Sequence, residues 1–208
     1  MKKFWIIIFI AGIFLGYMLG RPYVIADRQN ESVTIPIVAV SGENGTIGNA
    51  TFSLVSGSGR VLLDNNPLID TDMQGQIDIA IAYAKYYTNT TLDDKDIIID
   101  FDMHGEIVGG VSSGAAVAIG AIAILEDKKI TENILITGTI SPDGIIRRVG
   151  EIREKATAAR DAGYTLFLVP QGQSRYRFMN QTLQEYLNNT IEIREVSTIE
   201  DAARIMIR

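Results

Sequence analysis

The most informative segment of the chain reads Gly109-Gly110-Val111-Ser112-Ser113-Gly114-Ala115-Ala116. It joins an apolar run at residues 96–101, predicted to be a buried strand, to an alanine-rich run at residues 113–125, predicted to be an apolar helix. A Gly-rich turn at a helix start offers free backbone N–H groups and the positive end of a helix dipole. Such a turn can hold a phosphate or stabilise an oxyanion beside a hydroxyl nucleophile. Alternatively, Ser112 or Ser113 simply caps the helix.

Outward from this segment, strand-like and helix-like runs alternate. Strands are predicted at residues 34–40, 50–55, 96–101, 133–140, 145–149 and 165–169. Helices are predicted at residues 73–87, 113–125, 150–162 and 176–187, and Ser197-Thr198-Ile199-Glu200 reads as the capping box of a C-terminal helix. This order predicts an α/β (α+β) domain, with a mixed sheet and helices packed against it.

Composition limits the chemistry that this domain can perform. The 208 residues are 47% hydrophobic, which is enough for one domain, and the net charge of −6 without a basic run argues against a nucleic-acid partner. With no cysteine and one histidine, the chain has no disulfide, no Cys-based zinc site, no thiol nucleophile and no histidine cluster. Catalysis would therefore depend on Ser, Thr, Lys, Asp or Glu.

The N-terminus is predicted to be directed to a membrane. Two lysines precede an uncharged apolar run at residues 4–19, so we expect a signal or transmembrane anchor at residues 1–20, a linker at 21–33 and the folded domain at 34–208. The lysines place the N-terminus in the cytoplasm and the domain outside it. An uncleaved anchor is the first expectation, and secretion after cleavage near Val24-Ile25-Ala26 is the alternative.

Six N-x-S/T sequons support the same location. They begin at Asn30, Asn44, Asn49, Asn89, Asn180 and Asn188. Such sites are glycosylated only in exported chains, so they favour an exported glycoprotein.

A lysine stands on the apolar side of the predicted helix 150–162. Lys155 shares a stripe with Ile152, Ala156 and Ala159, at the i, i+3, i+4 and i+7 spacing of one helix face. It can snorkel, with its stem covering apolar surface and its ammonium in water. It can also be desolvated enough to lose its proton and act as a general base.

These features together resemble the proteolytic domain of the Lon family, over nearly all of the chain from about Thr34. That family has a G-x-S motif opening a helix, T-G-x-I on a strand, V/I-G-G-L/I-K-E-K, A-A-x-x-A-G and a strand ending in proline. The corresponding residues are Gly110 to Ser112, Thr137 to Ile140, Val149 to Lys155, Ala158 to Gly163, and Leu168 to Pro170. Lys155 lies 43 positions after Ser112, as in the family. The segment Pro67 to Gly75 also resembles membrane-linked members.

The resemblance implies a Ser-Lys dyad peptidase. Ser112 would be the nucleophile, Lys155 its general base, and Thr137 the residue whose hydroxyl holds Lys155 in position. No metal or organic cofactor is implied. The implied substrates are peptides or unfolded proteins, and the implied assembly is a homo-oligomeric ring, a hexamer.

Two departures from the family pattern matter. The family's D-G-P-S-A-G core lacks its acidic residue here, and the preceding loop is shorter. No G-x-x-x-x-G-K-S/T motif for ATP occurs, so we expect ATP-independent cleavage. One alternative is a non-catalytic binding or assembly module that keeps this fold. A more distant one is a small-molecule kinase of the GHMP type, whose G-x-x-S-S-A loop is similar to residues 111–115.

Overall fold

The computed structural model describes residues 32–64, 68–103, 107–108, 110–176 and 181–208. All elements named below belong to the unit of residues 31–208. The predicted signal or anchor at residues 1–20 and nearly all of the predicted linker lie outside the described residues. No helix within the described ranges is long and apolar enough to cross a membrane.

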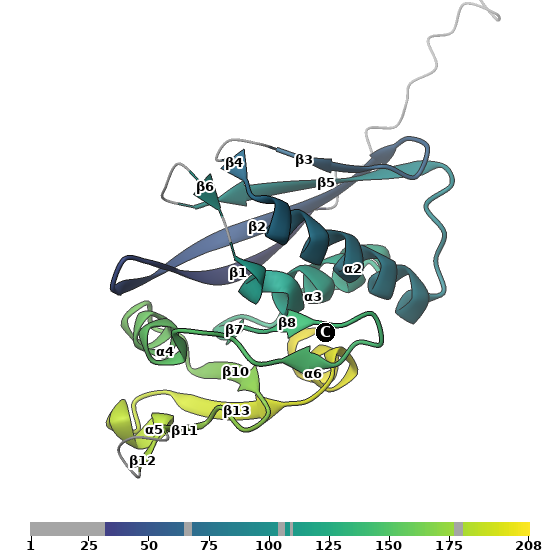
Figure 1. Cartoon of the computed structure of the whole chain (residues 1–208). Coiled ribbons are helices and arrows are strands. Elements are labelled where there is room, and N and C mark those ends of the chain that lie inside the picture. Colours follow the sequence, from purple (N-terminus) through teal and green to yellow (C-terminus); the bar gives the residue numbers. More distant parts are fainter. Residues whose placement is uncertain (1–31, 65–67, 104–106, 109, 177–180) are drawn as a thin grey trace, which may run out of the picture. The chain divides into compact units, whose positions relative to one another are not determined.

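A four-stranded mixed sheet forms one layer of the domain (Figure 1). Its strand order is β1 (Ser32–Ser41), β2 (Asn44–Ser56), β5 (Lys95–Asp102) and β3 (Val61–Leu63). β1 and β2 form an antiparallel hairpin, β5 runs antiparallel to β2, and β3 runs parallel to β5. Alternate side chains of these strands point to the core, as the period of two requires; those buried include Val33, Ile35, Ile37, Ala50, Phe52, Ile97, Ile99 and Phe101.

Two helices cover one face of this sheet. α2 (Thr71–Thr88) packs along α3 (Gly114–Leu125), and the 3-10 turn η1 (Val111–Ser113) leads directly into α3. Residues 114–124 of α3 are all buried, which explains why this helix is apolar on every side. At Gly120 an added Cβ would lie 2.3 Å from the Phe52 ring, so glycine allows α3 to approach the sheet closely.

A second, parallel sheet forms the next layer, and α2 and α3 lie between the two (Figure 1). Its order is β13 (Glu192–Val196), β10 (Leu166–Pro170) and β7 (Ile134–Ile136). α4 (Ile152–Asp161), α5 (Leu183–Tyr186) and α6 (Ile199–Met206) belong to this half. Three two-stranded pairs complete the fold: β4 (Leu68–Ile69) with β6 (Ile107–Val108), β8 (Thr139–Ile140) with β9 (Ile146–Arg147), and β11 (Arg175–Tyr176) with β12 (Gln181–Thr182).

The expected mixed α/β class is confirmed, but three local predictions are wrong. The strand predicted at residues 133–140 is divided into β7 and β8, because the Gly138 N–H bonds the Ser112 carbonyl at 2.8 Å and Gly138 packs tightly against the Ile146 side chain. Of the helix predicted at 176–187, the described residues 176 and 181–187 form a helix only at α5, which follows the β11–β12 pair. The capping residue of α6 is Thr198 rather than Ser197, since Thr198 Oγ1 accepts the N–H of Asp201 at 3.1 Å.

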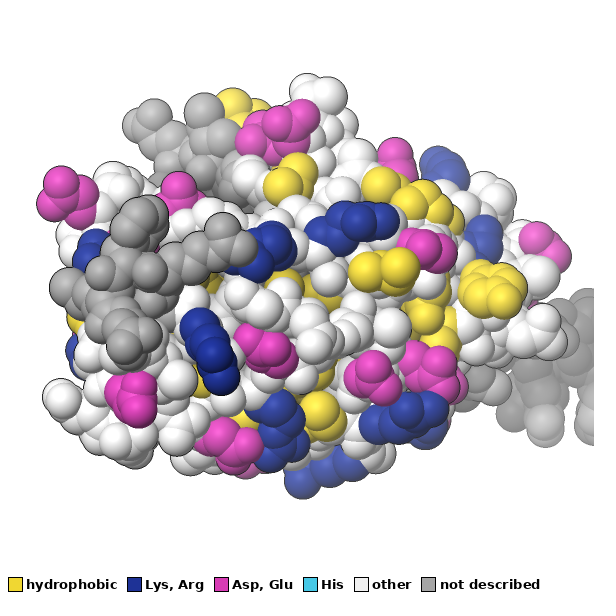
Figure 2. All heavy atoms as spheres, turned by 60° about the horizontal axis from the view of Figure 1, so that its bottom comes forward, with side chains coloured by type: hydrophobic (Ala, Val, Ile, Leu, Met, Phe, Trp, Pro, Cys, Tyr) yellow, Lys and Arg dark blue, Asp and Glu magenta, His cyan; other side chains and the backbone are white. Residues whose placement is uncertain are grey.

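The surface is mixed in charge. Figure 2 shows Lys and Arg side chains interspersed with Asp and Glu on one face. Oppositely charged neighbours pair there and elsewhere, for example Arg160 with Asp161 and Arg194 with Glu192. Four sequon asparagines lie within the described residues and all are exposed: Asn44, Asn49, Asn89 and Asn188. Asn30 and Asn180 lie outside them.

Candidate active site

The two adjacent serines of η1 have different surroundings. Ser113 is buried, and its hydroxyl donates to the sulfur of Met73 at 3.0 Å. Ser112 is half-buried, and its hydroxyl has no hydrogen-bond partner among the described residues. Although Ser113 precedes α3 directly, its side chain makes no capping bond. The helix-cap interpretation of these serines is therefore wrong, and Ser112 presents the more accessible hydroxyl.

The backbone of Ser112 is held by the turn between β7 and β8. The Ser112 carbonyl accepts the Gly138 N–H at 2.8 Å and the Thr137 hydroxyl at 3.1 Å, and the Gly138 carbonyl accepts the Ala115 N–H at 2.9 Å. A Cβ on Gly138 would lie 2.4 Å from Ile146 Cγ2, so this contact requires glycine. Thr137 is fully buried and holds the backbone of the predicted nucleophile. The expectation was that its hydroxyl holds Lys155, but the hydroxyl bonds the Ser112 carbonyl instead.

Lys155 lies on the buried face of α4 with only 3% of its surface exposed. Its amine donates to the Gly150 carbonyl at 3.1 Å. The snorkelling interpretation is therefore wrong, because the ammonium does not reach water. Desolvation by burial lowers the pKa of Lys155, although the carboxylates of Glu151 and Glu154 partly oppose this effect. The strands β1 and β2, which pack against α4, contain no charged residue within their bounds.

The start of α4 has an unusual backbone. Glu151, the residue before the first helical one, has a φ of +47°, which is uncommon for any residue except glycine. The preceding segment is held from outside the helix by Gln173, whose side-chain amide accepts the Val149 N–H at 2.9 Å and donates to the Val149 carbonyl at 2.8 Å. The Arg148 guanidinium also donates to the Gly172 carbonyl at 3.0 Å.

Comparison with known proteins assigns this arrangement to a family. The model of the Lon protease (S16) C-terminal proteolytic domain matches residues 15–208. The chain belongs to the Lon protease family. It is 26% identical over 199 residues to the archaeal Lon protease of Thermoplasma acidophilum, covering 94% of this chain and 28% of that protein. It is 24% identical over 205 residues to the Lon protease of Fusobacterium nucleatum, covering 93% of this chain and 25% of that protein.

A shorter match is closer in identity. The Lon protease of Phenylobacterium zucineum is 31% identical over 121 residues, which are 58% of this chain and 15% of that protein. The chain therefore spans about a quarter or less of the length of these relatives.

The structure adds a residue that sequence reasoning did not select. Asp70 caps α2, accepting the Met73 N–H at 2.7 Å through Oδ1, and its Oδ2 accepts the Gly110 N–H at 3.1 Å. Gly110, with a φ of +90°, lies two residues before Ser112. A carboxylate thus contacts the loop before Ser112 in this Lon domain, although the acidic residue of the family motif is absent from that loop. An aspartate before a helix signals a cap, but sequence cannot show the bond to Gly110.

Ser112 and Lys155 are not joined directly in the structure. The Lys155 amine bonds Gly150 at the start of its own helix, whereas Ser112 is bonded to Gly138 and Thr137. Catalytic hydrogen bonds are often long in ligand-free sites and shorten when substrate binds.

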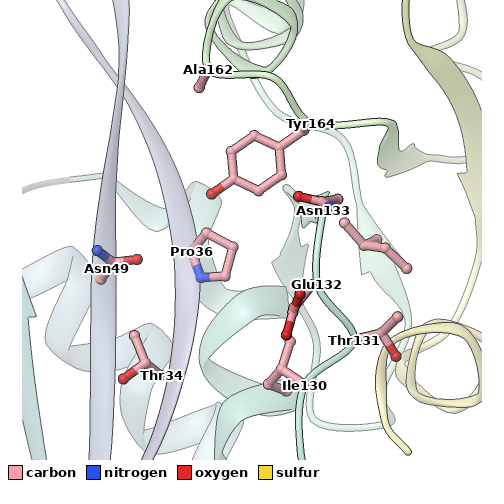
Figure 3. A pocket seen from close by; sticks show the side chains of 10 residues that line it. Thr34, Pro36, Asn49, Ile130, Thr131, Glu132, Asn133, Ala162 and Tyr164 are labelled. Carbon is pink, nitrogen blue, oxygen red and sulfur yellow. The ribbon is translucent and has the colours of Figure 1, made fainter.

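A surface pocket lies away from these residues. It has a volume of about 320 Å³ and is lined from β1, β2 and the segments before β7 and after α4. Figure 3 shows the Tyr164 ring beside Pro36, with Asn49, Asn133 and Glu132 around the same space. Ser112, Thr137 and Lys155 do not line this pocket, so it is separate from the candidate active site of the Lon domain.

Proposed function

We propose that this Lon domain is an ATP-independent serine endopeptidase that cleaves peptides or unfolded proteins with a dyad of Ser112 and Lys155. The observation that carries the proposal is the environment of Lys155. Lys155 is 3% exposed, its amine is bonded to a neutral carbonyl, and the strands β1 and β2 that pack against α4 carry no charged residue. Burial favours the neutral amine, which can accept a proton, and no histidine is needed.

The reaction follows from these groups. Ser112 Oγ attacks the scissile carbonyl while neutral Lys155 takes the hydroxyl proton, which gives a tetrahedral oxyanion. The Lys155 ammonium then gives its proton to the leaving amine, the C–N bond breaks, and an acyl ester remains on Ser112. Water then attacks the ester, gives a proton to Lys155 and releases the acid product, after which Ser112 regains its proton.

Backbone N–H groups at the start of η1 and α3 would stabilise the oxyanion. The Ala115 N–H is already bonded to the Gly138 carbonyl, and the Gly114 N–H to the Val111 carbonyl. The N–H groups of Ser112 and Ser113 are therefore the candidate donors, because the first N–H groups of a helix lack partners within it.

A fluorophosphonate probe tests the assignment of the nucleophile. We expect covalent labelling at Ser112, located by peptide mass spectrometry, and no labelling in Ser112→Ala. Ser113→Ala is the matched control and should still be labelled, because Ser113 bonds Met73 in the interior. A folded protein that is not labelled would contradict the proposal and favour the non-catalytic binding module.

The pH dependence tests the base. Since Lys155 must be neutral to accept a proton, activity should increase with pH through one ionisation. Burial lowers the pKa of Lys155, so the midpoint should lie well below that of a free lysine, about 10.4. A midpoint at the free-lysine value would show that Lys155 is not the base.

The cellular location is part of the proposal. The apolar run at residues 4–19 and the exposed sequons at Asn44 and Asn89 support a membrane-anchored protein with its catalytic domain outside the cytoplasm. The anchored form should keep its N-terminus and stay in the membrane after carbonate washing, and a glycosidase should reduce its mass. A mature N-terminus at Asp27 would instead indicate the secreted form.

A hexameric ring is proposed from the family resemblance. Mass measurement of the full chain in solution should give six copies. A monomer that still cleaves peptides at micromolar concentration would contradict it.

A further inference from the structure

The side chain of Gln173 is buried but lies outside the dyad. It is 6% exposed and belongs to the loop that follows β10, where its backbone N–H bonds the Pro170 carbonyl at 3.1 Å. Both ends of its amide bond the peptide groups of one residue, Val149, at 2.9 and 2.8 Å. A buried amide satisfied in this way fixes its partner strongly, because breaking either bond leaves a buried polar group unpaired.

The bonds to Val149 determine where the next residue lies. The Val149 carbonyl is part of the peptide plane that leads into Gly150, and the Gly150 carbonyl accepts the Lys155 amine at 3.1 Å. Gly150 is exposed, and a Cβ built on it would meet nothing within 4 Å. Side-chain packing therefore does not hold Gly150 in place, and its position depends on polar bonds to its neighbours.

We propose that Gln173 is a positioning residue for the base: it holds the Gly150 carbonyl that orients the amine of Lys155. A neutral amine has two N–H donors and one lone pair, so binding one donor restricts the direction of the lone pair. This inference rests on the dyad proposed above, but it concerns the placement of Lys155 rather than the identity of the nucleophile.

The surroundings of Lys155 make its placement important. The charged groups that act on it are Glu151 at the start of α4 and Glu154 on α4. The strands near the buried face of α4 are β1, β2, β7 and β10. None of them carries a charged residue within its bounds. An amine that moves from this site gains water, and its pKa returns toward the ordinary value.

The test compares two glutamines of one loop in the full chain. Gln173→Met keeps the length of the side chain but cannot bond Val149. Gln171→Met is the matched control, because Gln171 is exposed and its side chain accepts a bond from Ser197 instead. We expect Gln173→Met to lower kcat by about 10- to 100-fold with KM within about twofold, and the control to remain near the parent protein. Gln173→Asn keeps an amide on a shorter side chain, so its kcat should lie between those of Gln173→Met and the control.

The pH profile separates positioning from a purely structural effect. Gln173→Met should move the midpoint of the kcat profile upward by about half a pH unit or more, since the amine becomes better solvated. Unfolding curves define conditions in which every variant is folded. An unchanged midpoint, or a loss of activity that only follows the folded fraction, would overturn the proposal.

A second readout does not depend on turnover. In protein labelled with ¹³C-lysine, the Cε resonance of Lys155, assigned by its absence in Lys155→Arg, reports the ionisation of this amine directly. A higher pKa of Lys155 in Gln173→Met than in the parent protein supports the positioning role, even if the parent protein proves inactive. An unchanged titration in an active enzyme overturns the role of Gln173 and leaves the dyad intact.

Discussion

The proposed nucleophile and the proposed base lie on helices of opposite character. Ser112 precedes α3, where residues 114–124 are all buried, whereas Lys155 lies on α4, whose buried residues are Lys155, Ala156 and Ala159. The Ser112 carbonyl is bonded by the turn between β7 and β8, in which Thr137 is fully buried. The segment before α4 is held by the side chain of Gln173 and by the bond from Arg148 to the Gly172 carbonyl. The proposed nucleophile thus precedes a fully buried helix and is bonded to a tightly packed turn, whereas the proposed base is a buried residue of a partly exposed helix whose start is held by a few polar bonds.

The largest effect is expected at the base itself. Lys155→Arg should lower kcat by about 10⁴-fold, because arginine keeps the positive charge but cannot accept a proton near neutral pH. Lys155→Met should be equally inactive. Peptide hydrolysis measured from pH 6 to 10 checks this, with circular dichroism to confirm folding. Substantial activity in Lys155→Arg would mean that Lys155 has only a structural role.

The support of the nucleophile should be intolerant of added volume. Gly138→Ala places a methyl group 2.4 Å from Ile146 Cγ2, so the free energy of unfolding should fall by about 1–3 kcal/mol. Displacement of Gly138 also strains its bond to the Ser112 carbonyl, and labelling of Ser112 should slow. Urea denaturation and probe kinetics measure the two effects.

The control for this change is Gly75→Ala. Gly75 lies exposed in α2, where a Cβ would meet nothing within 4 Å, so alanine should stabilise the protein by up to about 1 kcal/mol. If Gly138→Ala is as well tolerated as Gly75→Ala, tight packing around Gly138 does not hold the Ser112 backbone in place.

The carboxylate of Asp70 should have a smaller effect. In Asp70→Asn the single amide oxygen can cap α2 or accept the Gly110 N–H, but not both. Because asparagine caps helices about as well as aspartate, stability should hold, while kcat falls by about 10-fold as the nucleophile loop loses its bond. Asp78→Asn, an exposed residue of the same helix, controls for the change in charge. Equal activity in the two variants would show that Gly110 needs no support from α2.

The smallest effect is expected at Glu151. The left-handed conformation at Glu151 costs a non-glycine residue about 1–2 kcal/mol, and Glu151→Gly relieves this cost. Because the flexibility of glycine in the unfolded chain offsets part of the gain, the free energy of unfolding should increase by up to about 1 kcal/mol. Burial lowers the pKa of Lys155, and the charge of Glu151 partly opposes this effect. Loss of that charge in Glu151→Gly should therefore lower the pKa further and move the activity profile to lower pH.

Glu151→Gln separates the two effects, since it removes the charge and keeps the backbone strain. It should shift the pH profile without stabilising the protein. If neither variant changes the profile, the field of Glu151 does not reach the amine.

The sequence predicted much of the fold where local pattern and local structure agree. The strands 34–40 and 96–101 and the helix 113–125 were expected close to their observed places, because a period of two or a continuous apolar run is a local property. The helix predicted at 176–187 was wrong because the polar segment has no strong periodicity, and contacts with the rest of the protein determine its β11–β12 pair and short α5.

The site shows the same division. The spacing of Ile152, Lys155, Ala156 and Ala159 places a lysine on the apolar face of a helix, and this needs only the helical repeat. The bonds that position the site join distant residues: Asp70 and Gly110 are 40 positions apart, and Val149 and Gln173 are 24 apart. No local pattern encodes such pairs.

By itself, the sequence determined the mixed α/β class, the buried character of α3 and the side of α4 that carries Lys155. Tertiary structure alone decided that Ser113 faces Met73 while Ser112 stays accessible, that Thr137 bonds the Ser112 backbone, and that the Lys155 amine is out of water. The physical reason is that periodicity specifies which face of a helix is apolar, but burial and hydrogen bonding depend on what covers that face. For Lys155 the cover includes β1 and β2, which come from the beginning of the domain, about a hundred residues earlier.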